Sequence, residues 1–112
     1  MGYIQEEHGS TILVVVDLEK ATLIDAGELK TILFQIIESG WRKMIIDLTE
    51  CEFIDSTFLG TIVISFKKIT ELGGKLRLVG VQSDVKSMFQ LTRVNKIFEV
   101  FESREDALES FM

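Results

Sequence analysis

The residues best suited to carry chemistry lie side by side, where Asp55, Ser56 and Thr57 follow one another. Residues of these types often cap the start of a helix, because a side-chain oxygen can accept the unpaired amide protons of the first turn. The same position would leave the Ser56 hydroxyl exposed at the positive end of a helix, where a phosphate group is well tolerated. The tripeptide is therefore either a phosphorylation site or a helix cap without further chemistry.

Few other residues could support catalysis. A serine hydrolase would need glycines around Ser56 and a histidine base, but residues 54–58 contain no glycine and the only histidine, His8, precedes them. The single pair of adjacent glycines, Gly73-Gly74, precedes a predicted strand, whereas a phosphate-binding loop opens a helix. The acidic residues between 47 and 55 are interpreted as a solvated loop. We therefore predict no enzymatic activity, no catalytic residue, and neither a metal nor a cofactor bound by this chain.

Composition and charge limit the remaining classes of function. A length of 112 residues, 46% of them hydrophobic and 27% charged, fits one folded domain with a modest core. The net charge of −6 argues against nucleic-acid binding, which needs a basic face. The sequence has no membrane-spanning apolar run and no signal pattern, and its single cysteine, Cys51, excludes an internal disulfide. We expect a cytoplasmic protein that binds neither nucleic acid nor a membrane.

Apolar periodicity predicts strands and helices on both sides of the tripeptide. Residues 3–17 are predicted to form a hairpin that turns at Gly9-Ser10. Apolar residues at helical spacing predict one helix through residues 29–37 and another over residues 56–72. Further strands are expected at 43–48, 75–79 and 97–101, a short helix after Ser83, and a terminal helix that Ser103 caps. The expected fold is α/β, with a mixed β-sheet of four or five strands and helices packed mainly on one face.

A receiver domain of a response regulator is one alternative at this stage. The run Ile12–Asp17 resembles the first receiver strand, and Asp47 ends a strand as the acceptor aspartate would. However, Asp17 is followed by Leu18, where receivers have a second acid, and a hairpin precedes the first predicted helix. The strand over residues 75–79 ends in Gly80, where receivers place Ser or Thr.

The ordered set of motifs resembles the STAS family, in particular the small single-domain anti-sigma factor antagonists of bacteria. Members show an apolar strand, a loop, and then Asp-Ser-Ser/Thr-Gly-Leu-Gly opening a helix. Here Ile45–Leu48 is followed by Asp55–Gly60, and the helix ends at Gly73-Gly74 before an apolar strand. A short helix with Val85–Phe89 and an apolar strand with aromatic residues at Lys96–Phe101 complete the series. The resemblance covers nearly the whole chain and implies one STAS domain over residues 1–112.

The resemblance implies a mechanism called partner switching. In that family the serine after the motif's aspartate is phosphorylated, which corresponds to Ser56. The unmodified antagonist binds an anti-sigma factor, which is also an ATP-dependent serine kinase, and thereby frees a sigma factor. Phosphorylation ends the binding, and a PP2C-type phosphatase restores it. ATP and magnesium would belong to the partner kinase.

The resemblance also implies which residues meet the partner, namely Thr22, Asp55, Ser56, Thr57 and Phe58. Two departures from the family pattern fall on this surface. Phe58 stands where the family usually has glycine, and Glu19–Thr22 replaces a Gly-Glu-Leu-Asp-like segment. A diverged STAS interaction module without phosphorylation is therefore the second alternative.

Overall fold

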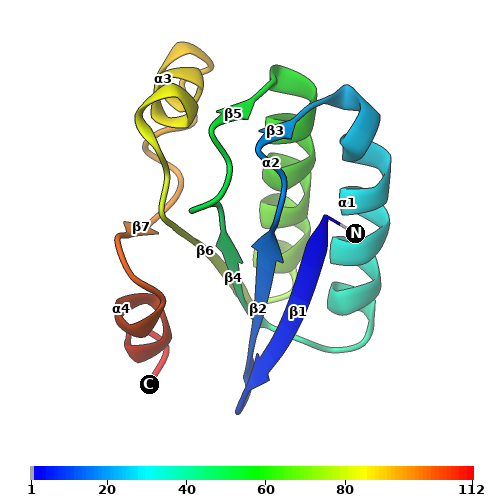
Figure 1. Ribbon diagram of the computed structural model, residues 1–112. Coiled ribbons are helices and arrows are strands. Elements are labelled where there is room, and N and C mark those ends of the chain that lie inside the picture. Colours follow the sequence, from blue (N-terminus) through cyan, green and yellow to red (C-terminus); the bar gives the residue numbers. More distant parts are fainter. Residues whose placement is uncertain (1) are drawn as a thin grey trace.

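A five-stranded mixed sheet forms the centre of the protein in a computed structural model that describes residues 2–112 (Figure 1). The order across the sheet is β1, β2, β4, β6 and β7. β1 pairs antiparallel with β2, and the remaining neighbours pair parallel. The strands span Tyr3–His8 (β1), Thr11–Val16 (β2), Lys43–Asp47 (β4), Lys75–Val79 (β6) and Val100–Phe101 (β7). The predicted α/β fold with a mixed sheet is confirmed.

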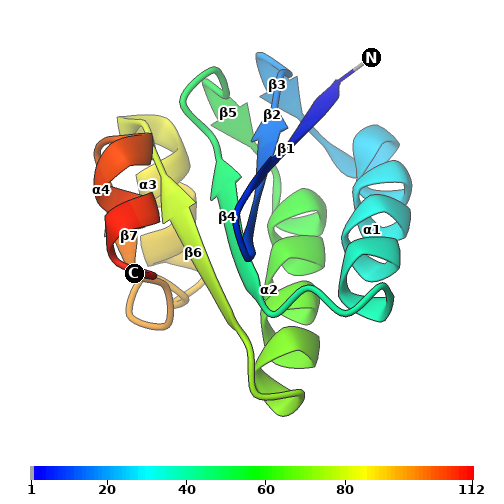
Figure 2. The same ribbon diagram turned by 90° about the horizontal axis from the view of Figure 1, so that it is seen from below.

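Helices cover both faces of the sheet, but unequally (Figures 1 and 2). α1 (Leu23–Glu38) and α2 (Ser56–Glu71) lie on one face, while the short α4 (Arg104–Glu109) lies on the other. α3 (Ser83–Leu91) adds Val85 and Phe89 to the core beneath α1 and α2. All six residues of β2 are buried, as expected for a strand covered on both faces. Within residues 2–112, no helix combines the length and apolar character that crossing a membrane requires.

The helix and turn boundaries follow local signals in the sequence. Gly9 turns the predicted hairpin with a φ of 63°, and Gly40, with a φ of 105°, follows the end of α1. The apolar stripe of α2 is buried at Leu59, Ile62 and Ile69, which confirms the predicted helix register. Ser103 caps α4 by accepting a hydrogen bond from the amide of Asp106 at 3.1 Å.

Two parts of the strand prediction need correction. The last strand was predicted over residues 97–101, but β7 contains only Val100 and Phe101. Phe98 leaves the sheet because its ring packs into the core, with its centroid 5.1 Å from that of Phe66. A separate two-stranded sheet was also missed, in which β3 (Lys20–Ala21) pairs parallel with β5 (Phe53–Ile54). Such two-residue strands have no periodicity to detect.

Candidate functional site

A single carboxylate joins the starts of α1 and α2. Asp55 Oδ1 accepts a hydrogen bond from the amide of Phe58 at 2.9 Å, which caps its own helix. Asp55 Oδ2 accepts a second one from the amide of Leu23 at 2.8 Å, at the first residue of α1. Asp55 is half-buried. The predicted cap therefore serves two helices at once, and it fixes their positive ends next to each other.

The start of α1 has a cap of its own. Thr22 Oγ1 accepts a hydrogen bond from the amide of Ile24 at 3.3 Å, and Asp25 Oδ2 accepts one from the amide of Thr22 at 3.0 Å. This reciprocal arrangement is a capping box. Thr22, which the resemblance assigned to the partner surface, thus lies beside Asp55 and has a structural role there.

The loop before Asp55 is held by backbone bonds to the β3 segment. The amide of Glu52 donates to the carbonyl of Glu19 at 2.8 Å, and the amide of Asp55 donates to the carbonyl of Ala21 at 3.1 Å. Cys51 is fully buried within this loop, and burial raises the pKa of its thiol. The loop is therefore ordered, and its cysteine is a poor nucleophile.

Ser56 is the first residue of α2, and both it and Thr57 are exposed. Asp55 provides the side-chain cap of the helix, so the Ser56 hydroxyl is not needed for that role. The side chain stands where the positive partial charge of a 16-residue helix is concentrated. This placement can accommodate a phosphate group.

Phe58 requires a correction. The resemblance placed it on the partner surface, but its side chain is 0% exposed and belongs to the main core. Phe58 lies four residues before Ile62, on the buried stripe of α2, so its ring faces the sheet. Its aromatic ring therefore does not stand beside the Ser56 hydroxyl on the surface.

Three exposed apolar residues near Ser56 were missed in the sequence. Leu23 and Ile24 open α1 with exposed fractions of 66% and 86%, and Phe53 in β5 is 40% exposed. Leu23 is bonded to the same Asp55 carboxylate that precedes Ser56. The sequence did carry a signal, because Leu23 and Ile24 fall outside the apolar stripe of their helix. We call these three residues the apolar rim.

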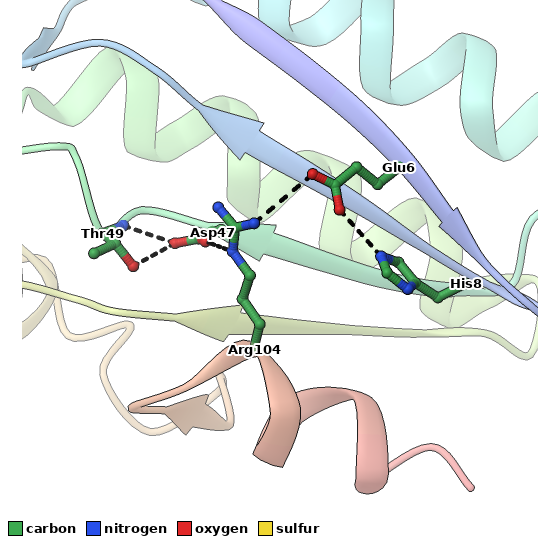
Figure 3. Close-up of polar contacts among 5 residues, drawn as sticks. All are labelled: Glu6, His8, Asp47, Thr49 and Arg104. Atoms are coloured by element: carbon green, nitrogen blue, oxygen red, sulfur yellow. Dashed lines mark hydrogen bonds and ion pairs between the residues drawn. The ribbon is translucent and has the colours of Figure 1, made fainter.

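The Asp47 side chain takes part in a network of polar contacts (Figure 3). Its side chain is 2% exposed, and Oδ2 accepts a hydrogen bond from Arg104 Nε at 2.5 Å. Oδ1 accepts from the amide of Thr49 at 2.9 Å and from its hydroxyl. Arg104 Nη1 also lies 3.7 Å from Glu6 Oε2, and Glu6 Oε1 contacts Nε2 of the exposed His8 at 3.1 Å. The bond to Asp47 raises the pKa of Arg104.

This network argues against the receiver alternative. A phosphoacceptor aspartate must be reached by a phosphate donor, whereas Asp47 is buried and bonded through both oxygens. Asp47 instead fixes α4 and the start of the loop that leads to Asp55. The antiparallel β1 at the edge of the sheet agrees with this conclusion.

Comparison with known proteins gives a consistent result. The family model described as STAS domain matches residues 4–107. A Thermotoga maritima protein assigned as an anti-sigma factor antagonist is 30% identical over 80 residues, which are 71% of each chain. The anti-sigma-B factor antagonist of Staphylococcus aureus is 27% identical over 78 residues, covering 70% of this chain and 72% of the relative.

Solved structures show the same fold. The crystal structure of a Thermotoga maritima protein assigned as an anti-sigma factor antagonist has a TM-score of 0.85 at 25% identity, covering 96% of this chain and 92% of that one. Unphosphorylated SpoIIAA, an anti-sigma factor antagonist, has a TM-score of 0.86 at 14% identity and 97% and 95% coverage. A match over nearly the whole chain, together with these relatives, shows that the chain belongs to the STAS domain family.

Proposed function

We propose that this protein is an anti-sigma factor antagonist that works by partner switching, with Ser56 as its phosphorylation site. The observation that carries the proposal is the exposed Ser56 at the start of α2, next to an aspartate that already caps the helix. The curated relatives are named as anti-sigma factor antagonists. SpoIIAA, which shares the fold, has been solved in both a phosphorylated and an unphosphorylated form.

The unphosphorylated form binds an anti-sigma factor that is also a serine kinase, and so frees a sigma factor. The kinase supplies ATP and magnesium, and a PP2C-type phosphatase reverses the modification. The chain acts in the cytoplasm as a ligand and a substrate, without a cofactor of its own. The relatives' names describe a regulator, which supports the expectation that this protein catalyses no reaction.

The apolar rim provides the contact area for the partner. Leu23, Ile24 and Phe53 expose apolar surface around a serine, and burying apolar area at the core of an interface favours binding. Phosphorylation adds about −1.5 to −2 charge units at neutral pH. The phosphate would have to lose water beside this apolar surface and the Asp55 carboxylate, which is unfavourable without a cationic partner.

Phosphorylation should leave the fold unchanged. The phosphate faces the start of α2, an interaction worth about 0.3–1 kcal/mol, which offsets repulsion from Asp55. A desolvation penalty of about 3 kcal/mol at the interface would weaken binding more than a hundredfold. The switch therefore acts through charge at the docked surface and requires no refolding.

Calorimetry with the cognate anti-sigma factor tests the proposal. Ser56→Asp and the authentic phosphoprotein should keep the fold and lose most of the affinity, while Ser56→Ala should bind and resist switching. Ser83→Asp is the matched control, because Ser83 is also the exposed first residue of a helix, α3. Undiminished binding by both Ser56→Asp and the phosphoprotein would reduce Ser56 to an ordinary helix position.

The chemistry of labelling separates this proposal from the receiver alternative. A serine phosphoester requires the kinase and ATP and is stable in acid, whereas an aspartyl phosphate forms from acetyl phosphate and is labile. Phosphate incorporation should therefore persist in Asp47→Asn and disappear in Ser56→Ala. The reverse pattern would overturn the assignment of Ser56.

A further inference from the structure

Basic side chains gather at the end of the sheet opposite Ser56. Lys43 and Lys75 are the first residues of the parallel strands β4 and β6, and they are register partners. Arg77 lies two residues further along β6, on the same face as Lys75, because side chains alternate along a strand. The 16-residue α2 separates this end from Ser56 by about 24 Å.

The pairing of two lysines is unfavourable by itself, because like charges directly opposite each other in a sheet repel. Arg77 forms an ion pair with Glu99 at 3.1 Å. Within residues 2–112, neither Lys43 nor Lys75 has a carboxylate partner. Among the described residues, the hydrogen bonds of Lys43 Nζ go to neutral oxygens, the hydroxyl of Ser10 and the carbonyl of Phe111, each at 3.4 Å. This concentration of positive charge is notable in a chain with a net charge of −6.

Part of the cluster has a structural explanation. Arg77 Nη1 donates to the carbonyl of Ser110 at 3.0 Å, and its guanidinium lies 4.2 Å from the centroid of the Phe111 ring. Arg77 and Lys43 therefore hold the end of the segment that follows α4. Lys75 is exposed, and its side chain makes no such contact with any residue that the structure describes, so anchoring of this segment does not account for it.

Lys43, Lys75 and Arg77, together with a fourth basic residue, Arg42, line a pocket of 280 Å³. Gly73, Gly74, Ser110, Phe111 and Met112 also line this pocket. This volume is at the lower limit of small-molecule sites and suits a small ligand better than the flat surface of a protein. Lysine and arginine side chains are the usual ligands of phosphate groups.

We infer that this pocket binds a small phosphate-bearing anion, with Lys43, Lys75 and Arg77 as its ligands. The bound phosphate would relieve the repulsion between the paired lysines. Inorganic pyrophosphate and a phosphorylated metabolite share this chemistry. The site is independent of the phosphorylation of Ser56, because it lies at the far end of α2.

NMR titration of the labelled protein with sodium pyrophosphate, at constant ionic strength, tests the inference. Saturable shifts are expected for the amides of Lys43, Gly74 and Lys75, with smaller or no shifts at Ser56. Lys75→Gln should weaken binding by about tenfold or more, the loss expected for one hydrogen bond to a charged group. Lys67→Gln is the matched control, since Lys67 is exposed on α2 away from the pocket, and it should bind as the wild type does.

Shifts that do not saturate, or equal affinities of the Lys75→Gln and Lys67→Gln variants, would overturn the inference and leave the cluster as an anchor for the chain end. If pyrophosphate binds, titration with a nucleoside monophosphate at the same ionic strength tests for an organic group. Added shifts at Phe111 and Met112 would indicate a phosphorylated metabolite, whereas identical shifts would indicate the phosphate group alone. Both results support the phosphate site.

Discussion

The face of the sheet under α1 and α2 carries a large cluster of buried apolar side chains. Among the described residues, the cluster on the other face is smaller: it combines Leu13, Val15, Ile45 and Val79 of the sheet with Ala107 of α4, and Phe101, Leu108 and Phe111 pack against it partly buried. On the second face, α4 is fixed by a buried carboxylate, Asp47, that binds Arg104. The first face therefore gains its stability from burial of area, which tolerates small changes. The second face depends on a few polar contacts, and their loss would expose α4 specifically.

The largest effect is expected from a charge in the apolar face. Ile62→Asp places an unpaired carboxylate where the side chain is 0% exposed, and the cost is comparable to the entire stability of a small domain, about 5–15 kcal/mol. Circular dichroism should show an unfolded protein. Lys67→Asp, on the exposed side of the same helix, should fold normally. Equal stability of the two variants would refute the difference between the two sides of α2.

A smaller loss of stability is expected from substituting Asp47, on the face of the sheet that α4 covers. Asp47→Asn removes the charge that Arg104 binds, and we expect a loss of about 2–3 kcal/mol, below that of a fully buried pair because the Arg104 side chain is 43% exposed. Glu6→Gln breaks the outer ion pair of the same arginine and should cost less than about 1 kcal/mol. Urea denaturation measures both. If the two variants lose similar amounts of stability, the burial of Asp47 does not make its bond to Arg104 stronger than the exposed ion pair between Glu6 and Arg104.

A third variant tests the carboxylate contact between the starts of the two helices on the apolar face. Asp55→Ala removes the cap of α2 and the bond to Leu23, and it should cost about 1–2 kcal/mol. Buried Cys51 should then react faster with Ellman's reagent, because the loop before Asp55 opens more often. Asp84→Ala is the control, since α3 has no side-chain cap bond. Unchanged Cys51 reactivity would mean that the backbone bonds alone hold the loop.

The smallest effect should be a gain in stability. Ser65 is fully buried on α2, and its hydroxyl has no hydrogen-bond partner among the described residues. Ser65→Ala should stabilise the protein by about 1 kcal/mol by removing this unsatisfied group. Ser87→Ala is the control, because the exposed Ser87 hydroxyl donates to the carbonyl of Ser83 at 3.0 Å. A loss of stability in Ser65→Ala would indicate that its oxygen fills space the core needs.

Much of this arrangement was determined by the sequence itself. The hairpin with Gly9, the apolar stripes of both long helices, and the caps at Asp55 and Ser103 all depend on residues within a few positions of each other. Local periodicity and capping chemistry reveal such features directly. The position of Ser56 at the start of α2 could therefore be predicted, together with its exposure.

Only the tertiary structure decided the contacts between distant residues. The bond of Asp55 to Leu23 spans 32 positions, and that of Asp47 to Arg104 spans 57. Neither pair leaves a local pattern, because each forms only after packing brings two elements together. Phe58 shows the same limit within a motif. The resemblance to the family suggested a surface residue, but α2 packs on the sheet with the Phe58 ring in the core. Side-chain direction depends on which face of a helix is buried, and packing fixes that face.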